Sequence, residues 1–166
     1  MTRRLKYDWL QQGLIFGAIL GILWAFYNLI FNLTPVAGQS NSVFIKIMPM
    51  IIMPLVLSLA GFISGRRNRS VRAGLLTGLC AALIAMLISA LSLYILMAAF
   101  MPSVRNNTYV INKQFLNFPT TDIDRVIITS AISSTLLATT IALAEGLFLG
   151  ALGGFIGMWS REYRSE

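Results

Sequence analysis

Four long apolar stretches constrain this chain more than any other feature of its sequence. They run over about residues 10–31, 43–65, 71–101 and 123–159. Each reaches the roughly 20 mostly apolar residues that a helix needs to cross a bilayer. We therefore predict an all-α fold: an integral membrane four-helix transmembrane bundle, forming a single domain over residues 1–166. Residues 102–122 are expected to form an outer loop.

Composition supports a membrane protein and removes several functional classes. Hydrophobic residues make up 57% of the chain and charged residues only 11%, whereas soluble domains carry about 25% charged residues. Histidine is absent, and the single cysteine is Cys80, within an apolar stretch. A His-ligated haem, a Cys/His zinc site, an iron–sulfur cluster and a His-dependent nucleophile all lack their residues. We expect no metal site, no cofactor bound by its own side chains, and no enzymatic activity.

The basic residues predict the orientation of the helices. Nine Lys and Arg lie in the two terminal segments and around the turn between the second and third stretches, and four lie elsewhere. By the positive-inside rule, both termini and this turn are cytoplasmic. The turn residues expected to contact lipid headgroups are Arg66, Arg67, Arg69 and Arg72. Nucleic-acid binding is disfavoured, because the basic residues flank the stretches in short groups. We expect the plasma membrane of a bacterium.

Glycines fall mostly in the predicted cytoplasmic half, with a spacing of four. Small residues at i and i+4 let two helix backbones approach closely, which drives helix association in lipid. We expect a helix-packing interface at Gly13, Gly17, Gly21, Gly61, Gly65, Gly74, Gly78, Gly146, Gly150 and Gly154.

In the fourth stretch the pattern extends outward through small residues to Ser130. Because four residues advance more than one helical turn, this groove winds around the helix. It is the face at which we expect another subunit, or a second copy of the chain.

Larger side chains occupy the predicted outer half, including Trp24, Tyr27 and Met97. Methionine and aromatic residues line adaptable apolar sites, so one interpretation is an outer pocket for a lipid or quinone. The alternative is that these side chains fill the bundle or face lipid.

Glu145 is the one ionisable residue deep within an apolar stretch. Such residues are functional candidates in membrane proteins. If Trp159 and Trp9 mark one interface, Glu145 is level with about residue 23. We therefore expect Trp24, Tyr27 and Asn28 as its hydrogen-bonding neighbours. The site would carry a proton, hold a cation or bind a partner; the alternative is a purely structural hydrogen bond.

The sequence favours a small non-catalytic subunit, scaffold or assembly factor of a larger membrane complex. Its expected partners are other membrane subunits or copies of itself, together with lipids. Two alternatives remain open: a small transporter or channel that uses Glu145, and a lipid- or quinone-binding membrane protein.

Overall fold

Four helices make up the described part of the chain. The computed structural model describes residues 8–33, 43–111 and 119–162. They form α1 (Asp8–Leu33), α2 (Val43–Asn68), α3 (Val71–Ile111) and α4 (Thr120–Glu162). All four are long and apolar enough to cross a membrane. The prediction of an all-helical bundle with four such helices is confirmed.

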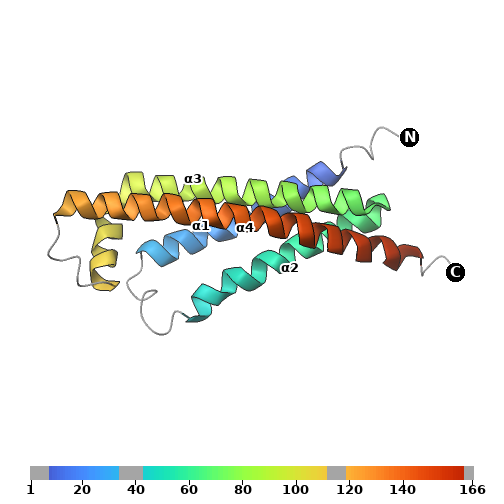
Figure 1. Cartoon of the computed structure of the whole chain (residues 1–166), viewed down its shortest axis with the longest axis horizontal. Helices are drawn as coiled ribbons and strands as arrows, with labels where there is room; N and C mark the ends of the chain where they lie inside the picture. The colour runs from blue at the N-terminus through green and yellow to red at the C-terminus, as the bar shows by residue number, and fades with distance from the viewer. Residues whose placement is uncertain (1–7, 34–42, 112–118, 163–166) are drawn as a thin grey trace.

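The helices run in alternating directions along one long axis (Figure 1). One end contains the start of α1, the α2–α3 turn and the end of α4; we call it the hairpin end, and the other the loop end. α3 packs against both α1 and α4, and α2 packs chiefly against α4. α3 and α4 lie side by side along their length, whereas α2 diverges from them toward the loop end (Figure 1).

Glycines lie where the helix backbones come closest. A Cβ added to Gly61 of α2 would lie 2.7 Å from the Cα of Gly150 on α4, and one added to Gly74 of α3 would lie 2.5 Å from the Cα of Gly154. Distances below 3.0 Å leave no room for a methyl group beside a backbone. On α1, a Cβ added to Gly13 would lie 2.7 Å from the Cβ of Cys80 on α3.

A small buried core lies beside these crossings. It combines large residues such as Leu20 and Leu57 with small ones such as Ala81, Ala82 and Ala142. Large side chains of two helices fit against alanines of the other two, which gives dense packing between closely spaced backbones. The core therefore holds α1 and α2 against the α3–α4 pair.

α3 is longer than predicted because it continues past a kink. Phe100 leaves helical geometry (φ −127°, ψ 20°), and Pro102 follows it. A proline ring clashes with the carbonyl four residues earlier and lacks an N–H, which kinks a helix. Residues 102–111, assigned to the outer loop from the sequence, are thus helical and turn across the loop end (Figure 1). Residues 112–118 of the predicted loop lie outside the described residues.

Candidate functional site

The described residues show no hydrogen bond between Glu145 and the neighbours predicted for it, Trp24, Tyr27 and Asn28. Glu145 lies half-buried on α4 and makes no hydrogen bond or ion pair within the described ranges. Its neighbour Gly146 faces Gly78 and Ala82 of α3. Asn28 instead bonds Ser89, which lies seven residues beyond Ala82 on α3, or about 10 Å at ~1.5 Å per residue. Tyr27 and Trp24 lie with Asn28 on α1.

A partly open pocket of about 450 Å³ lies between α1, α3 and α4 near the loop end. Its volume falls within the 300–1,000 Å³ that is usual for small-molecule sites. The lining combines aliphatic, aromatic, amide and hydroxyl side chains, and none of these residues is charged. They are Tyr27, Asn28, Phe31, Asn32, Leu93, Met97, Val104, Val126, Ile127, Ser130, Ala131 and Ser134.

Asn28 fixes the inner end of this pocket. Its side chain is buried, and its Nδ2 donates to the Oγ atoms of Ser89 and Ser92, each at 3.1 Å. Ser92 in turn donates to the carbonyl oxygen of Ser89 at 2.7 Å. Polar groups in an apolar interior must be paired in this way, so the network holds α1 and α3 in one register.

Asn32 and Asn107 order the outer end of the pocket. Asn32 donates through Nδ2 to the carbonyl oxygen of Asn28 at 2.8 Å. Asn107, beyond the α3 kink, donates to the carbonyl oxygens of Phe31 (3.3 Å) and Asn32 (3.0 Å). The last carbonyls of a helix have no intrahelical donor, so Asn107 caps the C-terminal end of α1.

A charged pair joins α3 and α4 next to the pocket residue Val104. Arg105 follows the lining residue Val104 and binds Asp124 of α4 through two parallel contacts, at 2.8 Å and 2.5 Å. Bidentate pairs of this kind are strong and directional. The kinked end of α3 is therefore tied both to α1 and to α4. This pair could not be predicted from the sequence, because Arg105 and Asp124 lie on opposite sides of residues 112–118.

Aromatic rings form one wall of the pocket. The rings of Tyr27 and Phe31 are stacked, with centroids 5.7 Å apart, and Trp24 is tilted against Tyr27 at 5.9 Å. Trp24 also packs against the buried core. Two predicted site residues, Tyr27 and Asn28, thus line this pocket, while the third, Trp24, supports it.

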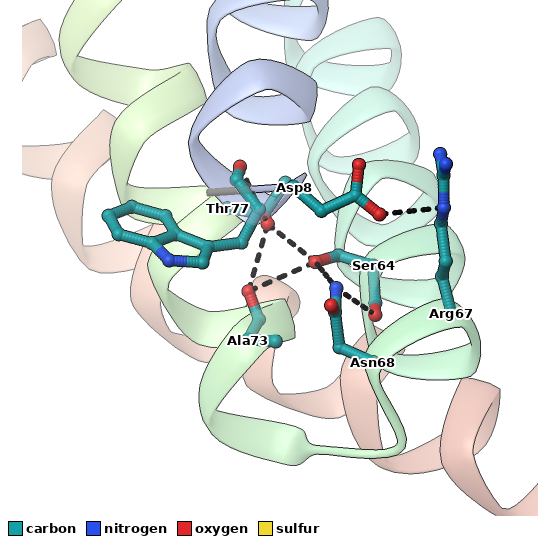
Figure 2. A network of polar contacts seen from close by, with 7 residues as sticks. Asp8, Ser64, Arg67, Asn68, Ala73 and Thr77 are labelled. Atoms are coloured by element: carbon teal, nitrogen blue, oxygen red, sulfur yellow. Dashed lines mark hydrogen bonds and ion pairs between the residues drawn. The ribbon is translucent and has the colours of Figure 1, made fainter. Parts of the chain in front are cut away.

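A second polar cluster lies at the hairpin end (Figure 2). Thr77 Oγ1 lies 2.7 Å from Ser64 Oγ, 2.8 Å from the Ala73 carbonyl oxygen and 3.2 Å from that of Trp9. Asp8 binds Arg67 at 2.6 Å. These contacts join the start of α1 to α2 and α3. The buried hydroxyls of Ser64 and Thr77 are therefore paired within the protein, and we assign them a structural role.

The predicted headgroup residues lie around the same turn. Arg66 and Arg67 line an open surface pocket of about 450 Å³ together with Phe62 and Ile63. Arg69 has a positive φ of 51°. It occupies the position after the helix that glycine usually takes, and Ser70 N–H closes the turn to the carbonyl oxygen of Gly65 at 3.3 Å.

The glycine groove of α4 is already occupied within the chain. Gly146, Gly150 and Gly154 face α3, and Gly153 and Gly157 face α2. This part of the groove, where the sequence predicted a partner, is therefore covered by α2 and α3 of the same chain. The outer part differs: Ser130 and Ser134 are exposed and line the loop-end pocket.

The hydroxyls of α4 bond mainly to their own helix. Thr135 donates to the carbonyl oxygen of Ala131 at 2.7 Å, Thr139 to that of Thr135 at 2.7 Å, and Thr140 to that of Leu136 at 3.0 Å. Hydroxyls satisfied by the preceding turn are common in apolar helices. They do not form a polar path that leads to Glu145.

Comparisons with protein families, curated proteins and solved structures find no match to this chain.

Proposed function

We propose that this chain is a non-catalytic membrane protein that binds an apolar molecule with a polar head in the loop-end pocket. The observation that carries the proposal is the pocket itself. Three helices build it, its walls are largely apolar, and ordered amide groups lie at its inner and outer ends. Apolar walls with a few convergent polar groups are typical of small-molecule sites.

The geometry favours this function over transport through Glu145. A conduction path needs polar groups in succession, whereas the threonines nearest to Glu145 on α4 are satisfied by their own helix. The pocket lies closer to the loop end than Glu145 does, between the parts of α1 and α4 that are nearest that end.

Filling the pocket tests this proposal. Ala131 lines the pocket, whereas its neighbour Ser133 is exposed on α4 and does not line it. Purified wild-type protein should carry a defined apolar molecule in solvent extracts analysed by mass spectrometry. Ala131→Leu should lose it, and Ser133→Leu should keep it. Equal retention by both variants, or a wild-type extract that holds only bulk membrane lipid, would contradict the proposal.

A second candidate is a subunit of a larger membrane complex. It rests on the exposure of α4. In an 18-residue apolar segment of α4 only 6% of the residues are buried, whereas the corresponding share is 22% in α1 and 33% in both α2 and α3. A partner helix on α4 would cover this surface. We would solubilise native membranes in mild detergent and measure the particle. Other polypeptides at fixed stoichiometry, or several copies of this chain, support a subunit; a single copy alone contradicts it.

We propose that the hairpin end is cytoplasmic and that the membrane is the plasma membrane of a bacterium. Arg66, Arg67, Arg69 and Arg72 all lie at this end, where positive charge is retained on the cytoplasmic side. In this orientation the glycine spacing of four supports close helix packing in the cytoplasmic half. The arginines then lie at the level of anionic headgroups.

A further inference from the structure

Three asparagines at the loop-end pocket use their donor groups on the protein itself. Asn28 Nδ2 donates to two serine hydroxyls, Asn32 Nδ2 to a carbonyl oxygen, and Asn107 Nδ2 to two carbonyl oxygens. Asn28 and Asn32 line the pocket, and Asn107 binds the backbone of two lining residues, Phe31 and Asn32.

The partners fix which way each amide points. A carbonyl oxygen only accepts hydrogen bonds, so an NH₂ group must face it. This sets the orientation of Asn32 and Asn107. The Ser92 hydroxyl donates to the carbonyl oxygen of Ser89, which leaves its oxygen to accept from Asn28. All three amides are therefore held with NH₂ toward the protein.

The three amide oxygens remain as acceptors. The Oδ1 of Asn107, which does not itself line the pocket, is buried and has no hydrogen-bond partner among the described residues. No residue in the described ranges donates to the Oδ1 of Asn28 or Asn32. The Oδ1 atoms of the two lining residues, Asn28 and Asn32, are therefore acceptors at the pocket. An amide oxygen accepts hydrogen bonds and cannot donate them, so the two amides favour a ligand that donates.

The charges around the pocket favour a neutral ligand. No charged side chain lines it within the described residues. The nearest cation in sequence, Arg105, is held by Asp124. An anionic head would meet amide oxygens without a balancing charge, and a cationic head would lack a counter-ion. A hydroxyl suits the site best, because Tyr27 and Ser130 also supply hydroxyls that can donate to its oxygen.

We infer that the pocket selects a neutral apolar alcohol, whether a long-chain alcohol or a quinol, whose hydroxyl donates to the Oδ1 of Asn28 or Asn32. This inference rests on the proposed function and adds the chemical class of its ligand. An ether, an ester or a quinone of the same shape offers only acceptors and leaves the amide oxygens unpaired. Missing hydrogen bonds of this kind cause large discrimination between otherwise similar ligands.

Fluorescence quenching of Trp24 tests the inference directly. The chain has three tryptophans, so the double variant W9F/W159F retains only Trp24. The ring centroid of Trp24 lies 5.9 Å from that of the pocket residue Tyr27. The probes are 11-bromo-1-undecanol and its methyl ether, added to protein in detergent micelles. One hydrogen bond to a buried acceptor corresponds to about tenfold in affinity. We expect saturable quenching by the alcohol at about tenfold lower concentration than by the ether.

The outcomes separate the inference from the proposed function. Equal saturable quenching by alcohol and ether overturns the inference but leaves an apolar ligand site. An absence of saturable quenching by either probe overturns the proposed function. The comparison needs no substitution among the lining residues, so it does not depend on the folding of a pocket variant.

Two further comparisons test which residue accepts the hydrogen bond and which kind of alcohol donates it. Asn32→Leu removes one acceptor and should reduce the preference for the alcohol, whereas Ser133→Ala, outside the pocket, should not change it. An unbrominated hydroquinone should displace the brominated alcohol better than its oxidised quinone does. If the quinone displaces it better, the inference is overturned. Displacement by dodecanol but not by the hydroquinone assigns the site to long-chain alcohols.

Discussion

At the scale of single residues, the described part of the bundle contains few buried polar groups, and most of them are paired. Ser64, Thr77, Ser89 and Asn28 all find partners on a neighbouring helix or turn. Gln12 differs: the residue is 7% exposed, and both its amide nitrogen and its amide oxygen are buried without a partner in the part of the chain that the structure describes. An unpaired buried amide costs about 1–3 kcal/mol. Gln12 is therefore the clearest local weakness of the structure.

Replacing Gln12 by methionine should stabilise the protein. Methionine has a similar length and flexibility but no hydrogen-bonding requirement, so Gln12→Met should raise the free energy of unfolding by about 1 kcal/mol. The measurement is reversible unfolding in mixed micelles followed by circular dichroism. Gln11→Met is the matched control, because Gln11 is exposed on the same helix. A gain no larger for Gln12→Met than for Gln11→Met would show that the Gln12 amide is satisfied in the folded protein.

At the scale of the helices, backbone proximity sets the arrangement. Gly150 of α4 faces α3 so closely that an added Cβ would lie 2.8 Å from the carbonyl oxygen of Gly74 and 3.0 Å from the Cα of Gly78. Backbone atoms cannot rotate aside as a side chain can. Close contact of this kind takes the place of the hydrophobic effect, which does not drive helices together in lipid.

Gly150→Leu should therefore disrupt folding of the single chain. We expect a loss of at least about 3 kcal/mol, because the leucine must displace the α3 backbone. Thermal unfolding of the purified protein measures this loss. The control is Ala144→Leu, which adds the same side chain at an exposed position of α4 and should change stability little. A stable Gly150→Leu protein with altered particle size would instead place Gly150 at a contact between subunits.

At the scale of the whole molecule, both described ends of the chain lie at the hairpin end (Figure 1). An even number of crossings places both ends on one side. The hairpin end is also the end with Arg66, Arg67, Arg69 and Arg72. With the hairpin end cytoplasmic, as proposed, the loop-end pocket would open in the outer half of the membrane, on the side opposite to these charges.

Cysteine labelling in intact cells checks this orientation. In a Cys80→Ser background, single cysteines are placed by Ser70→Cys in the α2–α3 turn and by Asn106→Cys at the loop end. A membrane-impermeant maleimide should label the cysteine at position 106 directly and that at position 70 only after permeabilisation. Labelling of position 70 in intact cells, without labelling of position 106, would reverse the orientation and move the pocket to the cytoplasmic half.

The positions of the helices could be predicted from the sequence. Apolar length depends only on local composition, so each of the four predicted stretches coincides with a helix to within a few residues, apart from the extension of α3. That extension, residues 102–111, begins with Pro102 and contains two polar asparagines, Asn106 and Asn107, which are typical of a loop. It forms because Asn107 and Arg105 find partners on α1 and α4. Contacts with distant segments override such local preferences.

The tertiary structure alone decided how the helices are aligned. The level of Glu145 was predicted by counting residues from Trp9 and Trp159, on the assumption that both lie in one plane. In the structure, Gly13 and Gly146 instead face the same part of α3. From Gly146 to Trp159 is about 20 Å and from Gly13 to Trp9 about 6 Å, at ~1.5 Å per residue. α4 is thus shifted relative to α1, which separates Glu145 from Asn28 and brings Ser130 and Ser134 to the pocket. Glycine contacts between helices distant in sequence fix this shift, and no local pattern along one helix contains it.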